Sequence, residues 1–158
     1  MDDRLAMEAI RDLLRENLED PLTQWGQPER VWIHDDMPLT RATFPRIQIV
    51  KRPSSAADII DIGPDFLEWY SVVLDINFWY KLDFKWEKDG EYLKNEQLGE
   101  EYTTKIWTEG IKPYVQYLHD TYAITGLKNL GTVPPMKAED SQFYTSTISI
   151  RLWYFRKW

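Results

Sequence analysis

Hydrophobic and polar positions alternate strictly through the segment WYSVVLDINFWYKLDFKW, residues 69–86. Every second residue from Tyr70 to Trp86 is apolar or aromatic, whereas five of the eight residues between them are charged or carry an amide. A period of two predicts a strand with one buried and one wet face. About seventeen residues in a strand reach roughly 55 Å, which exceeds the diameter of a domain of this size. Two explanations stay open: a single strand that extends beyond its own core, or two strands divided by a bulge near residues 75–77.

A helical period marks two other parts of the chain. Leucine and isoleucine recur with helical spacing through residues 3–19 and predict an amphipathic helix, which Pro21 ends. A central helix is expected from about residue 97 to residue 122. Gly110 and Pro113 interrupt this second segment, so we expect either one kinked helix or two helices in series.

Shorter alternating segments predict the remaining strands. We expect strands at residues 31–34, 44–52, 127–133 and 143–158, a hairpin turn at Lys88, Asp89 and Gly90, and loops at residues 53–68 and 133–142. The loop at 53–68 is expected to contain one short extended piece. This order predicts a single α+β domain over residues 1–158, in which an N-terminal helix and a central helix pack on a mostly antiparallel sheet with one long strand.

The composition narrows the class of protein. The chain has 158 residues, of which 43% are hydrophobic and 28% charged, and this is typical of a soluble globular domain. Its net charge of −7 argues against nucleic-acid binding through phosphate contacts. The chain has no cysteine, no basic leader sequence and no apolar run of membrane-spanning length. We therefore expect an intracellular soluble protein with neither disulfides nor a membrane segment.

Aromatic residues are the unusual part of the composition. Eight Trp, nine Tyr and six Phe make up 15% of the chain. Aromatic side chains favour strands and also dominate protein–protein hot spots. Trp69, Trp79, Trp153 and Phe155 lie on the opposite parity to the apolar faces of their strands. A core alone therefore does not account for the aromatic residues, and some of them are expected at an interface.

The search for catalytic chemistry finds little. The chain has no nucleotide-binding glycine motif, no metalloprotease motif and no nucleophile elbow. His34 and His119 have no partner pattern, so we expect no catalytic residue, metal or cofactor. A carboxylate pair beside Trp79, with Asp75 as one member, is a weaker alternative that would suit sugar binding or hydrolysis.

Charged residues suggest pairing between strands or subunits. Lys81, Asp83, Lys85 and Glu87 alternate in sign along the predicted long strand, which suits cross-strand or cross-subunit ion pairs. The basic cluster of Arg151, Arg156 and Lys157 has two interpretations. It either keeps an edge strand soluble or contacts an acidic neighbouring chain.

The order of elements resembles a known family. An N-terminal amphipathic helix, the strand FPRIQIV, a long strand, a helix and the closing segment ITGLKNLGTVPPMKAEDSQFYTSTISIRLWYF follow one another. In this closing segment a short strand at 127–133 leads through Pro134, Pro135, Glu139 and Asp140 into a final strand at 144–155. The arrangement resembles the tail terminator proteins, also called tail-completion or head-to-tail joining proteins, of long-tailed bacterial and archaeal viruses.

The resemblance implies a structural role without enzymatic activity. Such proteins form a ring, usually of six copies, that ends growth of the tail tube and joins the tail to the head connector. The implied partners are further copies of the chain, the tail-tube protein and the connector or stopper protein, while viral DNA passes through the lumen without specific binding. The implied location is the virion, and the host cytoplasm during assembly. A ring would also explain a long strand shared between two subunits.

Candidate contact residues follow from this interpretation. Subunit contacts are expected at Trp79, Lys81, Asp83, Lys85, Glu87, Trp153, Phe155 and Arg156. A docking loop is expected at residues 53–65, with Arg52, Asp58, Asp61 and Asp65. Two alternatives remain: another neck or baseplate component of a virion, and a β-protein that binds a small ligand or carbohydrate through its aromatic residues.

Overall fold

The structure is a computed structural model that describes residues 2–35, 43–52, 60–62, 67–137 and 141–157. Its helical elements are α1 (Asp3–Asn17), the 3₁₀-helix η1 (Pro21–Trp25), α2 (Asn95–Lys105), the π-helix η3 (Ile106–Ile111), the 3₁₀-helix η4 (Lys112–Tyr114) and α3 (Val115–Tyr122). Its strands are β1 (Ile33–His34), β2 (Arg46–Lys51), β3 (Ile60–Ile62), β4 (Leu67–Lys81), β5 (Trp86–Lys88), β6 (Glu91–Leu93), β7 (Ile124–Lys137) and β8 (Phe143–Lys157).

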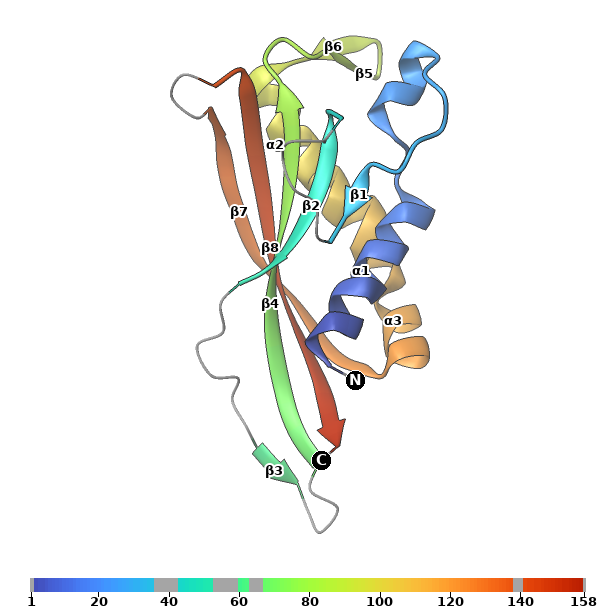
Figure 1. Cartoon of the computed structure of the whole chain (residues 1–158), viewed down its shortest axis with the longest axis vertical. Helices are drawn as coiled ribbons and strands as arrows, with labels where there is room; N and C mark the ends of the chain where they lie inside the picture. The colour runs from blue at the N-terminus through green and yellow to red at the C-terminus, as the bar shows by residue number, and fades with distance from the viewer. Residues whose placement is uncertain (1, 36–42, 53–59, 63–66, 138–140, 158) are drawn as a thin grey trace.

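One sheet forms the frame of the molecule. Its strand order is β1-β2-β4-β8-β7, and β3 pairs with the far end of β4. Only β1 and β2 run parallel among the described strands, and every other pair is antiparallel. The helices pack along one side of this sheet, and Figure 1 shows no helix on the other side. The α+β prediction with a mostly antiparallel sheet is therefore confirmed.

The long strand is continuous. β4 and β8 keep an unbroken register from Leu67 opposite Lys157 to Lys81 opposite Phe143, so no bulge interrupts residues 75–77. The prediction that the strand reaches residue 86 is wrong. Asp83 has a left-handed φ of 61°, and the Phe84 amide donates to the Lys81 carbonyl at 3.1 Å, so the chain turns directly after β4. Leu82 keeps the apolar pattern but is 37% exposed.

Residues after this turn form a separate small hairpin. β5 and β6 pair from Trp86 opposite Leu93 to Lys88 opposite Glu91. Asp89 and Gly90 both have positive φ, at 52° and 83°, which suits the two-residue turn that Asp-Gly favours. The predicted turn is thereby confirmed.

The interrupted central helix was also predicted correctly. A π-helical and a 3₁₀ turn separate α2 from α3. Gly110 lies in the π-helix against α1, where a Cβ atom would come within 2.7 Å of the Leu14 side chain. Pro113 lies in the 3₁₀ turn, and its missing N–H is one reason why the α-helix does not continue. The close contact of Gly110 with α1 and the missing N–H of Pro113 together explain why the helix is interrupted at this point.

β7 is longer than expected. It runs from Ile124 to Lys137, whereas a strand at 127–133 followed by a loop was predicted. Pro134 and Pro135 fall at one of three register shifts between β7 and β8. A proline is tolerated here because β7 is the last strand of the sheet and needs no outward N–H donor. The sequence pattern therefore gave the wrong end for this strand.

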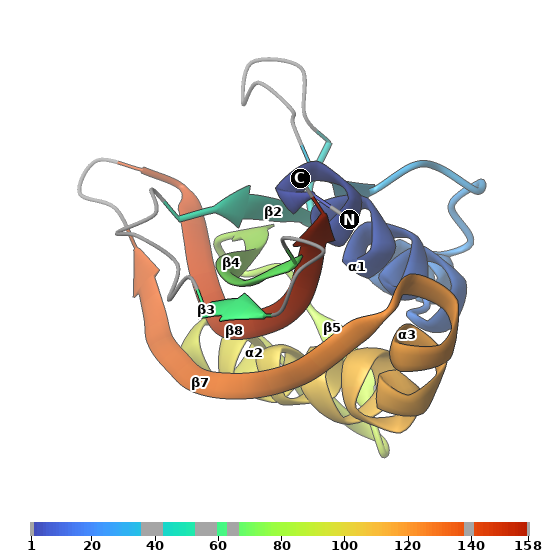
Figure 2. The same cartoon turned by 90° about the horizontal axis from the view of Figure 1, so that it is seen from below.

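The covered side of the sheet holds the core. From β4, Leu74, Ile76 and Phe78 point toward the helices and are fully buried. Phe78 stacks on Tyr102 of α2 with ring centroids 4.2 Å apart. Asp2 caps α1 by accepting the Leu5 amide at 2.8 Å. Seen from below, β7 bends round toward α3 and closes this side (Figure 2).

Candidate assembly surface

The side of the sheet away from the helices is called here the open face. Its side chains come from the alternate positions that the register places on that side: Arg46, Gln48 and Val50 of β2; Trp69, Ser71, Val73, Asp75, Asn77, Trp79 and Lys81 of β4; Phe143, Thr145, Thr147, Ser149, Arg151, Trp153 and Phe155 of β8; and Lys128, Val133 and Met136 of β7. Arg52, directly after β2, also reaches this face through its side chain.

A cluster of hydrogen-bonded polar side chains lies in the middle of the open face. Arg52 forms an ion pair with Asp75 at 2.9 Å and donates to the Ser149 hydroxyl at 3.0 Å. The Ser149 hydroxyl donates to Asp75 at 2.5 Å. Arg52 was predicted in a docking loop, but it is held to the sheet by these contacts. Asp75 is engaged by both partners, so it does not resemble a free catalytic carboxylate.

One end of the open face is an aromatic arm. We define the arm as residues 67–71 of β4 and 153–157 of β8, which extend beyond α1 and α3 (Figure 1). On its open side Trp69 and Trp153 lie with ring centroids 6.4 Å apart. The Trp69 indole N–H donates to the Thr125 hydroxyl at 3.0 Å. Phe155 is 39% exposed, so an apolar edge is left at the tip.

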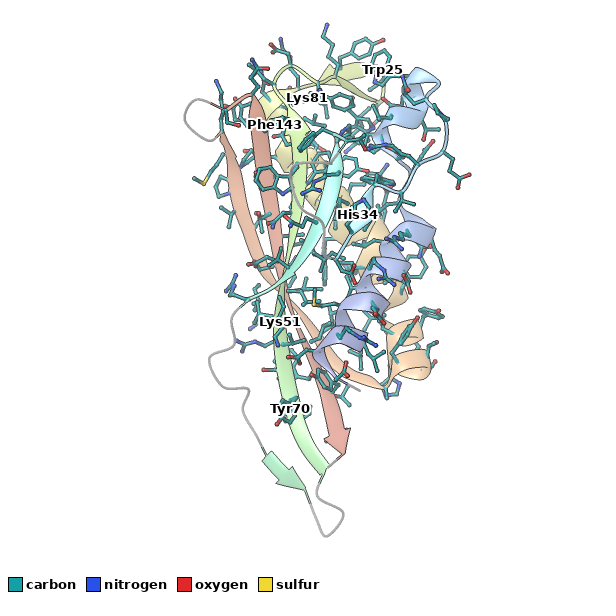
Figure 3. The ribbon with its side chains drawn as sticks, viewed as in Figure 1. Trp25, His34, Lys51, Tyr70, Lys81 and Phe143 are labelled. Carbon is teal, nitrogen blue, oxygen red and sulfur yellow. The ribbon has the colours of Figure 1, made fainter. Side chains whose placement is uncertain are left out.

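The other side of the arm is also aromatic. Tyr70 and Tyr154 stack with ring centroids 6.2 Å apart. Figure 3 places Tyr70 near the lower end of the molecule, while Lys81 and Phe143 lie at the upper end of the same strands. Tyr154 is fully buried and its hydroxyl donates to Asp3 at the start of α1, whereas Tyr70 is partly exposed. Aromatic rings therefore line both sides of the arm, but α1 reaches its base.

Arg46 is a buried cation on the open face. It is 1% exposed, and among the described residues none of its three guanidinium nitrogens has a hydrogen-bond partner. Its guanidinium lies 5.7 Å from the centroid of the Phe44 ring, which in turn lies 4.3 Å from the ring of Phe143. Burial lowers the pKa of Arg46, but guanidinium groups stay charged in proteins. The charge is therefore desolvated, and no carboxylate in the described part of the chain forms an ion pair with it.

Two further donors on this face lack acceptors within the described ranges. The Trp79 indole N–H, beside Arg46 in the register, is buried without a partner. The Nε of Arg151 is likewise buried and unpartnered, while its guanidinium lies 5.9 Å from the ring of Trp153. Unsatisfied buried donors are uncommon in folded proteins.

The structure divides the contact residues predicted on the long strand. Trp79 and Lys81 do lie on the open face at the end of β4. Asp83, Lys85 and Glu87 do not, because the chain turns after Lys81. Asp83 lies 3.8 Å from the Lys94 ammonium, and the Lys85 carbonyl accepts from Trp25. The prediction of one continuous charged row is wrong.

The structure also separates the remaining predicted residues. Trp153 and Phe155 lie together on the arm. Arg156 belongs to β8 and Asp61 to β3, but their side chains are outside the described part of the structure. Asp58 and Asp65 lie outside the described residues. At Arg151, β8 lies between β4 and β7, so the edge-strand explanation of the basic cluster is wrong for this residue. Arg156 and Lys157 lie beyond the last pair with β7, at Tyr154.

Sequence reasoning missed two cationic residues that the fold makes conspicuous. Arg46 has the parity of a wet face, and nothing in FPRIQIV indicates that it is buried. Lys128 pairs directly with Arg151 across β7 and β8, so two cations face each other. This juxtaposition depends on the register of two strands separated by a loop. No local pattern in the sequence could have indicated it.

Hollows also lie away from the open face. One cleft of about 320 Å³ lies between η1, the β5–β6 hairpin and α2, and Trp86 and several carboxylates line it. Lys105 of this cleft lies 5.1 Å from the Trp86 ring. In the described ranges no three His, Cys, Asp or Glu residues are grouped as metal ligands would be. His34 contacts the Val31 carbonyl and His119 contacts Asp120, in separate elements.

Within the described residues, none of the helices is both long and apolar enough to cross a membrane. No protein-family model matches the chain, and no curated protein matches it.

Proposed function

We propose that this protein is a structural subunit of a ring, of the tail terminator type, that assembles through its open face and its aromatic arm. The arm is the observation that carries the proposal. Two strands of one sheet extend past most of their helical cover and carry a group of aromatic side chains there, of which Phe155 is 39% exposed. Aromatic residues of this kind are enriched in the energetic centres of protein interfaces.

The order of elements supports the same proposal. An N-terminal helix, a strand, a long strand, a helix and a closing antiparallel pair follow one another, in the order on which the resemblance rests. The proposed partners are further copies of the chain, a tail-tube protein and a head connector or stopper protein. In this proposal viral DNA passes through the lumen of the ring without specific binding, and the protein belongs to the neck of the virion.

The unpaired donors on the open face add physical support. A buried polar group without a partner costs roughly 1–3 kcal/mol, and more when it is charged. Arg46, Trp79 and Arg151 all carry such groups on one side of one sheet. The chain itself covers these atoms, so a neighbouring molecule would remove this cost only if docking rearranged the covering side chains.

A second candidate function rests on the same aromatic residues. Trp69 and Trp153 could serve as a flat platform for a sugar ring, because their rings are tilted by 32° and lie side by side. A ligand-binding protein of this kind would stay monomeric and bind through the platform. The two proposals therefore differ in the mass of the protein in solution.

The test measures that mass by light scattering after size exclusion, over a wide range of concentration. We expect the wild-type chain to form a discrete ring and the Trp153→Ser, Phe155→Ser variant to remain at 18.9 kDa. Tyr117→Ser is the matched control, because Tyr117 is 43% exposed on α3, away from the arm. A wild-type chain that stays monomeric at every concentration, and binds an oligosaccharide, would replace the ring proposal with the second candidate.

A further inference from the structure

The open face carries more positive charge than the rest of the protein leads one to expect. The chain as a whole has a net charge of −7. Yet the described open-face residues include five cations, namely Arg46, Arg52, Lys81, Lys128 and Arg151. Asp75 is the one carboxylate among them, and Arg52 already occupies it. Four cations on this face thus have no carboxylate there.

Two of these cations oppose each other directly. Lys128 of β7 and Arg151 of β8 are register partners, and like charges directly opposite in a sheet are destabilising. Within the described residues neither has a carboxylate at salt-bridge distance, although the chain contains 26 acidic residues. The Arg151 guanidinium is held beside the Trp153 ring, so its position is fixed before any partner arrives. The pair is a preformed site for carboxylate groups.

The β5–β6 hairpin carries the complementary charge. Glu87, Asp89 and Glu91 are all exposed on it, and they have no cationic partner among the described residues. Lys88, the cation of the hairpin, is already bound to Glu101 at 2.6 Å. Three free carboxylates are thereby presented on one two-residue turn and its flanks.

The hairpin is also held rigidly. The Gln24 side chain accepts from the Glu87 amide at 2.8 Å and donates to the Glu87 carbonyl at 2.7 Å. Trp25 stacks on Tyr92 with ring centroids 6.1 Å apart. An element that is ordered before binding loses little entropy on docking. The hairpin therefore has both the charge and the rigidity of a docking element.

The two surfaces of one chain are too far apart to meet. Val73, which faces Arg151, is eight residues before Lys81 along β4, or roughly 26 Å at 3.3 Å per residue. The hairpin lies beyond the Lys81 end, at the end of the molecule opposite the arm (Figure 1). Contact between these surfaces must join two copies head to tail, and a contact of that type builds rings or filaments.

We propose that the acidic β5–β6 hairpin of one copy docks on the Lys128–Arg151 pair of the next copy. This inference rests on the proposed function and specifies which two surfaces of the subunit meet. The register places Glu87 and Glu91 on opposite faces of the hairpin, so its tip presents carboxylates on both sides to the charge of Lys128 and Arg151. The same docking brings a second copy onto the face that holds Arg46 and Trp79.

A charge-swap experiment tests the pairing. The face variant is Lys128→Glu with Arg151→Glu, and the hairpin variant is Glu87→Lys with Glu91→Lys. Each variant alone places like charges at the contact, so its dissociation constant should rise about 100-fold. An equimolar mixture should assemble again, because the acidic face of one variant meets the basic hairpin of the other. The chain that carries all four changes should also assemble alone.

Controls separate the contact from general charge effects. Arg4→Glu with Lys112→Glu changes the net charge as the face variant does, at exposed positions on α1 and η4, and should leave assembly unchanged. Circular dichroism and the thermal midpoint show whether each variant is folded. Added salt should weaken assembly of the wild-type chain, since exposed charges are screened over about 10 Å at 0.1 M.

The outcomes distinguish this inference from the proposed function. Variants that assemble as the wild type does, or a mixture of folded variants that stays dissociated, would overturn the pairing and leave the ring proposal in place. A wild-type chain that is monomeric at every concentration and at low salt would overturn both. Restored assembly in the mixture, with loss in each variant alone, is the result that only a hairpin-to-face contact gives.

Discussion

The two faces of the β4–β8 sheet share the same backbone but are completed differently. On the covered face, Leu74, Ile76, Phe78 and Tyr80 are fully buried against the helices of the same chain. On the open face the alternate positions hold hydrogen-bonded polar groups, exposed rings and a buried arginine without a partner. The covered face supplies stability by itself, whereas the open face keeps unsatisfied groups that suit recognition.

The largest expected effect lies on the covered face. Phe78→Ala removes a ring that is 0% exposed and stacked on Tyr102, so the free energy of unfolding should fall by about 3–5 kcal/mol. Thr145→Ala, on the open face of the neighbouring strand, should change it by less than about 0.5 kcal/mol. Urea denaturation of both variants measures the difference. Equal losses would show that the open face is as well packed as the covered one.

The next largest effect compares two arginines whose replacement should change the free energy of unfolding in opposite directions. Arg30 binds Asp20 through two bonds of 2.7 and 2.9 Å, so Arg30→Met leaves a carboxylate unpaired and should destabilise the fold by about 3 kcal/mol. Arg46 has no hydrogen-bond partner among the described residues, so Arg46→Met should instead stabilise the monomer by roughly 1–3 kcal/mol. Denaturant titration of the monomeric chain measures both.

Assembly provides the second readout for Arg46. If Arg46 is kept for a partner, Arg46→Met should stabilise the monomer and weaken assembly in the same protein. A variant that is less stable and assembles normally would assign Arg46 an ordinary role in the fold. Arg30→Met serves as the reference, because its loss of stability has no expected connection with the open face.

The smallest effect concerns His34, which pairs with Gln48 beside the open face. Burial lowers the pKa of His34 from 6.5, and the nearby charges of Arg15 and Arg46 lower it further. The neutral ring is therefore favoured in the fold. The contribution of His34 to the free energy of unfolding is therefore full above the unfolded pKa of 6.5. It decreases as the pH falls below 6.5, because the unfolded chain then binds a proton that the folded chain does not. His34→Gln should flatten the stability profile between pH 7 and pH 5, and an unchanged profile would assign that slope to other groups.

Much of the fold was predictable because each element carries a local pattern. The alternation in β4, the spacing of leucine in α1 and the Asp-Gly turn are all determined by neighbouring residues. The errors arose where distant contacts decide the structure. Asp83 turns the chain although Leu82, Phe84 and Trp86 continue the alternation, and Asn95 holds that turn by accepting the Asp83 amide at 3.0 Å.

The candidate surface was predictable only in part. Trp153 and Phe155 were recognisable because aromatic side chains fell on the wet parity of a strand. Arg46 and the Lys128–Arg151 pair were not, since burial and register depend on segments far apart in the sequence. The alternation of positions along a strand assigns each side chain to one face of the sheet. It does not show which other parts of the protein pack against that face.

The unbroken pairing of β4 with β8 has a mechanical consequence. Both strands contain 15 residues and run from the arm into the helix-covered body without a bulge between them. In an antiparallel ladder the hydrogen bonds lie perpendicular to the strands. A pull on the tip of one strand along its axis loads these bonds together in shear, rather than opening them one after another. The arm is thus a stiff strut, and a load applied at its tip is carried directly into the core.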